Sequence, residues 1–310
     1  NFAGHAMKVA GIIAEDDPFH NGHAWQLSQA KALGAERVAV AMSCSLVQRG
    51  ALPLLPEAVR TRSALTCGAD LVFALPAPCA CAGAEAFARA GVALLAAAGC
   101  DGLVFGAETP DAALLLEAAE LLDSGSYRAA LKAQLAGGAR SFAAARQTAA
   151  AKLASDERVA ALLDKPNNNL AVEYCRAIRS LAPRTEAYPL PRQGANHGEA
   201  LHSAHGQFAS ASALRKLWAE GGADAVAPYV PEAVFPLYQE AYAAGQYTDF
   251  SAAGRCELAL LRSACRGKAP FADIRGVSEG LEHRLEAAVR TSNTYDELLD
   301  ALTTVRYPRA

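Results

Sequence analysis

The chain has 310 residues, of which 52% are hydrophobic, so it can bury a full core and divide into a larger N-terminal and a smaller C-terminal domain. Its 29 basic and 32 acidic side chains give a formal net charge of −3. This balance excludes a global positive field that gathers nucleic acid nonspecifically, so any RNA partner must meet a local patch. The chain contains no run of eighteen apolar residues, so no membrane span is predicted.

The chain carries eight cysteines, which lie inside apolar or helical patterns. They form no CxxC pair and no Cys/His cluster at zinc spacing, so we expect no metal ligand among the protein side chains. Reduced core thiols of this kind are typical of the cytosol, and a cytoplasmic protein is expected. Residues 1–6, before Met7, lack a signal-peptide pattern, and we expect them to be a vector remnant.

Four short apolar runs alternate with helical patterns in the first third of the chain. We expect strands at residues 8–14, 37–42, 70–75 and 102–105. Strands that alternate with helices of ten or more residues predict a Rossmann-like, doubly wound parallel α/β sheet. Ligands of such sheets bind beyond the carboxyl ends of the strands, where the turn-rich loop at residues 15–23 is expected to lie.

The middle of the chain is rich in alanine and leucine, and its apolar spacing predicts a helical insertion at about residues 110–165. The asparagines of residues 166–169 offer N-cap chemistry before a helix at residues 170–180. Residues 185–190 then predict a fifth strand that rejoins the sheet.

A further helix is expected to start near Ser210 to Ser212, after a loop rich in glycine and histidine. We therefore assign residues 7–224 to the main domain with its insertion, and residues 225–310 to a smaller helical region.

The main chemical signal is the tetrapeptide His20, Asn21, Gly22 and His23 at the start of the first helix. A helix N-terminus presents free amides and a positive dipole to phosphate, and two imidazoles add donors. Gly22 leaves room for a nucleotide to approach the backbone. Such a site suits attack of a nucleophile on the α-phosphorus of ATP, with Mg²⁺ offsetting the phosphate charge. Alone, the tetrapeptide also fits a helix start with exposed histidines.

A second set of phosphate donors follows far downstream, where Ser210, Ser212 and Arg215 come at the start of a helix. Simple N-capping explains one serine but leaves the other serine and the arginine without a role. The two sets together are more specific than either.

These two sets resemble the HIGH-motif nucleotidyltransferase superfamily. Further motifs narrow the resemblance to the tRNA(Met) cytidine acetate ligase family. They are Gly11–Glu15, Pro18–His23, Val47–Gly50, Gly68–Val72, Phe105-Gly106, Pro166–Asn168, Ser210–Ser212 and Val277–Glu282. The ordered set spans nearly the whole chain.

The resemblance implies an enzyme that uses ATP to activate acetate as acetyl-adenylate and then acetylates N4 of the wobble cytidine of elongator tRNA(Met). His20 and His23 are the implied catalytic residues, serving the phosphates. The expected ATP-binding residues are Ile13, Glu15, Pro18, Phe19, His20, Asn21, Gly22, His23, Gly106, Asn167, Arg192, Gln193, Ser210, Ser212 and Arg215.

Arg49 and Arg60 are the candidates for contacting the tRNA substrate, although a surface arginine is the alternative for each. The chain departs from the family pattern at Asp16, Asp17 and Glu57, which add carboxylates near the expected phosphate site. Two other functions remain open at this point. One is a small-molecule adenylyltransferase of the pantetheine-phosphate or nicotinate-nucleotide type, and the other is a nonenzymatic ATP-sensing or RNA-binding protein.

Overall fold

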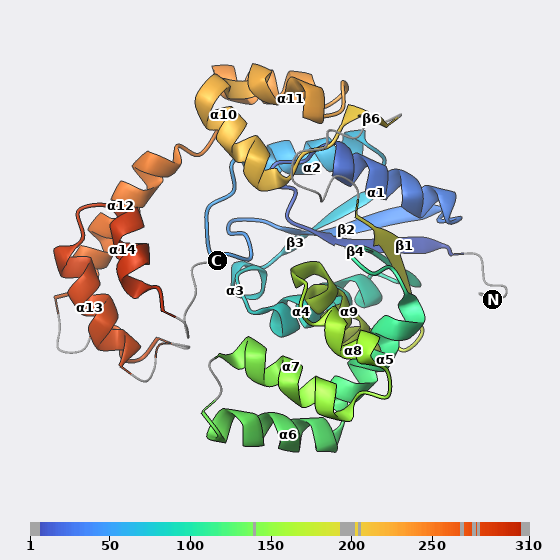
Figure 1. The fold of residues 1–310 in the computed structure, drawn as a ribbon. Helices are drawn as coiled ribbons and strands as arrows, with labels where there is room; N and C mark the ends of the chain where they lie inside the picture. The colour runs from blue at the N-terminus through green and yellow to red at the C-terminus, as the bar shows by residue number, and fades with distance from the viewer. Residues whose placement is uncertain are drawn as a thin grey trace. The chain divides into compact units, whose positions relative to one another are not determined.

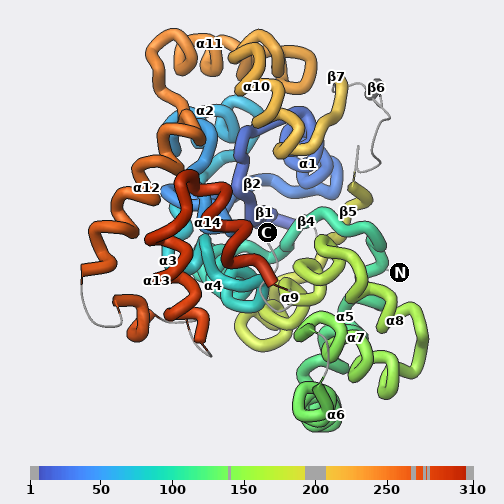
Figure 2. The backbone as a smooth tube through the Cα atoms, turned by 60° about the vertical axis from the view of Figure 1, so that its left-hand side comes forward, coloured from blue at the N-terminus to red at the C-terminus, as the bar shows by residue number. Residues whose placement is uncertain are grey.

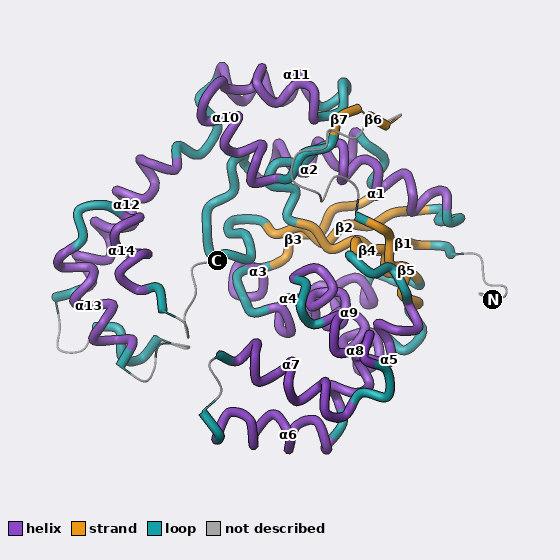
Figure 3. The backbone as a smooth tube through the Cα atoms, in the orientation of Figure 1, coloured by secondary structure: helices purple, strands orange, loops and turns teal. Residues whose placement is uncertain are grey.

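The structure is a computed structural model that describes residues 7–138, 141–192, 202–203, 206–266, 270–274, 277 and 280–304. Its centre is a parallel sheet of order β3-β2-β1-β4-β5. The strands are β1 (Val9–Ala14), β2 (Arg37–Ser43), β3 (Leu71–Leu75), β4 (Gly102–Ala107) and β5 (Glu186–Pro191). All five strands expected from the apolar runs are present, and the doubly wound α/β prediction is confirmed (Figure 3).

Both faces of the sheet are buried, which is why its strands lack a polar face. In β2, Ala39 and Ala41 point into one hydrophobic core, while Val38, Val40 and Met42 point into the other. Successive side chains of a strand alternate between faces, so a strand covered on both sides must be apolar at every position. The burial of both faces therefore explains the continuous apolar runs in the sequence.

Helices cover the two faces as separate layers (Figures 1 and 2). One layer contains α1 (Asn21–Ala32), α2 (Glu57–Thr66), α10 (Ala211–Val226) and α11 (Phe235–Ala243). The opposite layer contains α3 (Ala77–Ala80), α4 (Ala84–Ala97), α5 (Ala112–Asp123), α8 (Glu157–Leu162) and α9 (Pro166–Leu181). Close approach of α4 to the sheet depends on Gly91, because a Cβ there would lie 2.5 Å from Ile13 Cδ1.

The expected insertion is helical, with α6 (Gly125–Ala136) and α7 (Phe142–Leu153) between α5 and α8. The start of α9 differs from the prediction. Pro166 is its first residue, so the asparagines that follow lie inside the first turn instead of capping it. Proline suits this position because the first amide of a helix has no intrahelical partner.

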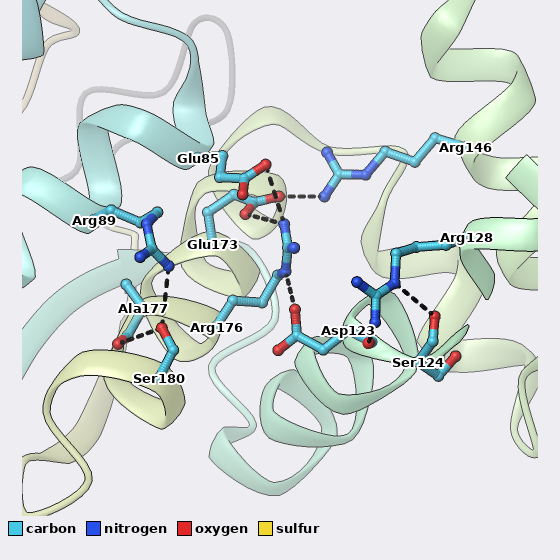
Figure 4. Close-up of polar contacts among 10 residues, drawn as sticks. All are labelled: Glu85, Arg89, Asp123, Ser124, Arg128, Arg146, Glu173, Arg176, Ala177 and Ser180. Atoms are coloured by element: carbon cyan, nitrogen blue, oxygen red, sulfur yellow. Dashed lines mark hydrogen bonds and ion pairs between the residues drawn. The ribbon is translucent and has the colours of Figure 1, made fainter. Parts of the chain in front are cut away.

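Ion pairs join the helices of the layer that contains α9 (Figure 4). The buried carboxylate of Glu173 accepts from Arg146 at 2.6 Å and from Arg176 at 2.7 Å. Arg176 Nε also donates to Asp123 at 2.8 Å, and its Nη1 lies 3.6 Å from Glu85. Because burial removes the Glu173 carboxylate from water, the hydrogen bonds from the two arginines replace those that water would make.

The chain forms two compact units. The first contains the sheet together with α10 and α11, since Trp218, Val226 and Tyr238 are part of a core that also contains Ile12 and Val40. The second contains residues 138–145 and 248–310, a later boundary than the one near residue 225 expected from the sequence.

The second unit has its own small hydrophobic core. Its helices are α12 (Phe250–Ala264), α13 (Leu281–Thr291) and α14 (Tyr295–Leu302). The buried core side chains are Leu258, Cys265, Phe271, Ala288, Val289 and Leu298. Within the described part of the chain, no helix has the length and apolar character needed to cross a membrane.

Candidate active site

The loop after β1 leads directly into α1, and its histidines close the start of that helix. His20 is the N-cap residue, and its Nδ1 accepts from Gly22 N at 3.0 Å. In return, His23 Nδ1 accepts from His20 N at 3.2 Å. The rings stack with their centroids 4.0 Å apart. The arrangement is a capping box in which two imidazoles replace the usual hydroxyl and carboxylate.

This capping changes which groups can meet a phosphate. Gly22 was expected to leave its backbone open to the nucleotide, but its amide already donates to His20. A Cβ on Gly22 would lie 2.7 Å from His20 Cε1, so glycine is needed to admit the imidazole. Since Nδ1 of each ring accepts a hydrogen bond, the neutral tautomer carries its hydrogen on Nε2. The donors available for phosphate are therefore Nε2–H groups.

His20 is electrostatically neutral at physiological pH. Burial lowers its pKa well below the ordinary value of 6.5, and the neighbouring His23 and Arg192 lower it further. A neutral imidazole still donates one hydrogen bond, and its protonation state does not change around neutral pH. His20 can therefore offer the phosphates a hydrogen-bond donor but no positive charge.

Asp17 gathers three segments around the loop. Its side chain is 1% exposed, and Oδ1 accepts from Leu54 N at 2.6 Å. Oδ2 accepts from Arg215 Nη1 at 3.1 Å and lies 3.8 Å from Arg49 Nη2. The same Arg215 nitrogen donates to the Asp17 carbonyl oxygen at 2.6 Å. One carboxylate thus joins the β1 loop, the loop after β2 and the first turns of α10.

Asp16 lies beside the second histidine. The residue has a positive φ of 49°, which aspartate tolerates better than most residues, and it is 2% exposed. Its Oδ1 lies 3.5 Å from His23 Nδ1. Burial raises the pKa of Asp16, although His23 and Arg60 act in the opposite direction.

Arg60 has a different role from the one expected. The side chain is fully buried and donates to carbonyl oxygens of Glu15 at 2.7 Å, Ser43 at 2.6 Å, Leu55 at 3.0 Å and Cys44. A guanidinium whose donors are taken up by the protein interior cannot also bind tRNA phosphates. Arg60 instead holds the loops that follow β1 and β2. Arg49, with 39% of its side chain exposed, remains accessible.

Several loop residues expected to bind ATP have side chains committed to packing. Asn21 Nδ2 donates to Gln207 O at 2.9 Å and to Pro228 O at 3.3 Å. Phe19 and Pro18 are buried, and Phe19 O accepts from Tyr238 at 2.6 Å. Ile13 packs toward α4, and Glu15 Oε1 accepts from Gln48 N at 2.5 Å. These residues can shape a nucleotide site mainly through their backbone.

A second group lies at the same sheet edge, after β4 and β5. Gly106 is exposed at the end of β4, where a Cβ would lie 3.4 Å from Arg192 Cγ. Arg192 is exposed, and its charge acts on His20. Gln26 of α1 donates to Val104 O at 3.0 Å and so ties the histidine-bearing helix to β4. Gln193, the neighbour of Arg192, lies outside the described residues.

The first turn of α9 is held by the residues after β4. Glu108 accepts from Asn167 N at 3.2 Å, from Asn167 Nδ2 at 2.7 Å and from Asn168 N at 2.6 Å. Thr109 N donates to Asn168 Oδ1 at 2.9 Å. This joins Asn167 to the residues that directly follow β4, which ends at Ala107.

The serines of the downstream motif lie where α10 begins. Ser210 is its N-cap and accepts from Ala213 N at 3.2 Å, while the hydroxyls of Ser210 and Ser212 are 3.1 Å apart. Arg215 reaches from this helix to Asp17. The two sets of phosphate donors singled out in the sequence are therefore joined through one aspartate.

The sequence did not identify Glu108 or Tyr238 as parts of this arrangement. The sequence did contain a signal for Glu108, because a carboxylate that follows a strand of a parallel sheet lies at the ligand-binding edge. Tyr238 had none, because its bond to Phe19 depends on the packing of α11 against the sheet. A separate cavity of about 560 Å³ lies near the opposite end of β5, beside Arg179 and Thr185. None of the described residues expected to bind ATP lines it.

A family model described as HIGH Nucleotidyl Transferase matches residues 7–310, and the chain belongs to this family. It is therefore an enzyme of the ligase and nucleotidyl transferase class.

The relatives identify the group within this family. The chain is 33% identical to the tRNA(Met) cytidine acetate ligase of Acetivibrio thermocellus, over 98% of this chain and 74% of the relative. The identity to the ligase of the same name from Syntrophotalea carbinolica is 35%, over 98% and 71%. The resemblance to the tRNA(Met) cytidine acetate ligase family, inferred from the motifs, is confirmed.

Solved structures of Thermotoga maritima TmcAL have the same fold. One, bound with alpha-thio ATP, matches with a TM-score of 0.87 and 29% identity, over 98% of this chain and 72% of that chain. An apo form matches with a TM-score of 0.89 and 30% identity, over 98% and 73%.

Proposed function

We propose that the chain binds ATP at the carboxyl edge of the sheet, activates acetate as acetyl-adenylate and transfers the acetyl group to N4 of a tRNA cytidine. The observation that carries the proposal is the pair of stacked imidazoles, held by their Nδ1 atoms with Nε2 available as donor, beside the Asp17–Arg215 link. The ligase names of the relatives and the ATP analogue bound by Thermotoga maritima TmcAL support it.

In the first step, an acetate oxygen attacks the α-phosphorus. A new P–O bond forms, the bond to the β-phosphate bridging oxygen breaks, and pyrophosphate leaves. Negative charge on the phosphate oxygens would be met by the Nε2–H groups of His20 and His23, with Arg49 and Arg215 supplying positive charge. None of these residues needs to form a covalent intermediate.

In the second step, N4 of cytidine attacks the acetyl carbonyl carbon. AMP leaves with the electrons of the broken C–O bond, and N4 loses a proton. The cytidine must be unstacked for this attack, which is feasible in a single-stranded loop. Exposed Arg49 is the candidate for a phosphate contact with the RNA.

Magnesium would enter with the nucleotide. Among the described residues, no group of three histidine, cysteine or carboxylate side chains is placed to hold a metal ion. Asp17 is already paired with Arg215. Mg²⁺ therefore fits best as an ion bound by the triphosphate and water, where it offsets phosphate charge.

The direct test incubates the protein with ATP, magnesium, labelled acetate and bulk tRNA, then digests the RNA and measures N4-acetylcytidine by mass spectrometry. Acetate-dependent exchange of labelled pyrophosphate into ATP tests the first step alone. Exchange without modified cytidine would reject tRNA as the acceptor and retain acetate activation. Exchange that requires a phosphorylated nucleophile or another small carboxylate in place of acetate would instead support a small-molecule adenylyltransferase.

A His20→Ala, His23→Ala double variant tests the placement of the site. We expect it to lose exchange activity, because both phosphate-facing donors are removed. Unchanged ATP affinity by calorimetry together with unchanged exchange would place the chemistry elsewhere.

A further inference from the structure

Glu108 makes contacts that concern more than the stability of α9. Its carboxylate receives three hydrogen bonds, two from backbone amides in the first turn of α9 and one from the side chain of Asn167. Burial raises the pKa of Glu108, but the bonds from Asn167 and Asn168 outweigh burial and hold it below its ordinary range. The group is therefore ionised at neutral pH and can only accept hydrogen bonds.

An acceptor-only partner fixes the orientation of an amide. Asn167 must turn its Nδ2 toward Glu108, 2.7 Å away, because its Oδ1 would be repelled by the carboxylate. The Oδ1 atom is thus directed away from Glu108. Glu108 determines that Asn167 offers an acceptor, and not a donor, to whatever lies beyond.

The neighbouring asparagine provides an internal comparison. Asn168 is buried, and both of its side-chain polar atoms are bonded to Thr109, at 2.9 Å and 3.1 Å. Asn167 is half-buried, and within the described part of the chain no donor bonds to its Oδ1. Of the two adjacent amides, only that of Asn167 retains an open acceptor.

This acceptor lies at the edge of the sheet that carries the histidines. Glu108 comes two residues after Gly106, at the carboxyl end of β4, and β4 pairs with β1 in parallel. The loop that bears His20 follows β1 at the same edge. If phosphate occupies the imidazole side, the remaining donors of ATP are the ribose hydroxyls and the 6-amino group of adenine.

We propose that Glu108 is a positioning residue of the nucleotide site, which orients Asn167 so that its Oδ1 accepts a hydrogen bond from the adenosine part of ATP. The inference rests on the proposed ATP chemistry. It adds Glu108 to the site and specifies that Asn167 contacts the nucleotide as a hydrogen-bond acceptor. No residue need move, since the amide is already oriented by the protein.

The test compares Glu108→Gln, Asn167→Ala and the double variant in acetate-dependent pyrophosphate exchange. Each single variant is expected to raise KM for ATP about tenfold, the equivalent of one well-formed hydrogen bond, with little change in kcat. The double variant should be no worse than Asn167→Ala, because Glu108 acts through that side chain. Glu117→Gln is the matched control, an exposed carboxylate on α5 that bonds to Ser155.

Nucleotide analogues identify the donor. Loss of the preference for ATP over 2′-deoxy-ATP or 3′-deoxy-ATP in both single variants assigns a ribose hydroxyl, and loss of the preference over ITP assigns the amino group. If Glu108→Gln lowers thermal stability but leaves KM and every preference unchanged, its role is structural only and the proposal is overturned. Effects that multiply in the double variant would also overturn it.

The same comparison separates this proposal from the proposed function. If the wild-type protein shows no acetate-dependent exchange, calorimetric affinities for ATP and the three analogues provide the same ratios without acetate. If the wild-type protein binds ATP more tightly than an analogue and both single variants lose this difference, the role of Glu108 is supported even though acetate activation is rejected. If the affinities do not differ between the wild type and the variants, the role proposed for Glu108 is rejected.

Discussion

Replacing Arg60 by methionine tests whether this arginine belongs to the interior or to a substrate site. The side chain is fully buried and donates to the carbonyl oxygens of four residues. An unpaired buried acceptor costs about 1 to 3 kcal/mol, so four of them at the lower value give an expected loss of about 4 kcal/mol. Such a loss is a large fraction of the roughly 5 to 15 kcal/mol that stabilises a typical domain.

Urea unfolding followed by tryptophan fluorescence measures this change. Arg49→Met is the matched control, because Arg49 is 39% exposed and lies 3.8 Å from Asp17. It should change the unfolding free energy by less than about 1 kcal/mol while weakening tRNA binding and its salt dependence. The reasoning is wrong if Arg60→Met remains as stable as the wild type but no longer binds tRNA.

Three further perturbations have defined signs. Because the pKa of folded His20 lies well below 6.5, the unfolded chain binds a proton that the folded chain rejects as pH falls below 6.5. In urea unfolding at several pH values, His20 should lower the unfolding free energy by up to about 1.4 kcal/mol for each pH unit below 6.5. This fall should be smaller in His20→Asn, which retains a capping side chain but no imidazole. Glu173→Ala should cost about 3 to 5 kcal/mol in the same assay, since two arginines lose a buried partner, whereas exposed Glu120→Ala should be nearly neutral; equal losses would contradict this. Asp17→Asn should tighten pyrophosphate binding in calorimetry, since Arg215 stays anchored to the residue 17 carbonyl while its charge is no longer offset; weaker binding would show that the carboxylate itself holds the arginine.

The fold could be predicted because its information is local. A strand buried on both faces must be apolar throughout, and the run from Val38 to Met42 has that property without a competing helical period. The start of α1 was also clear, since the turn-rich loop ends where the helical pattern begins. The start of α9 was misplaced because asparagine is a common N-cap, and the partners that admit it to the first turn are distant in sequence.

The internal arrangement of the site depends on such distant partners. Asp17 and Arg215 are 198 residues apart, and Glu108 and Asn167 are 59 apart. Sequence spacing cannot show that these pairs meet. The same limit explains Arg60, whose burial follows only from the convergence of two loops on its guanidinium.

The three acidic residues that depart from the family pattern, Asp16, Asp17 and Glu57, would by their charge alone repel phosphate. Asp17 is buried and paired with Arg215, so its charge is neutralised before a nucleotide arrives. Asp16 lies 3.5 Å from His23, and burial raises its pKa. Glu57 lies in the first turn of α2, where a negative charge stabilises the helix dipole. Two arginines, Arg49 and Arg215, flank the single carboxylate of Asp17, so a net positive charge remains for a triphosphate, and Mg²⁺ bound with the nucleotide would add to it.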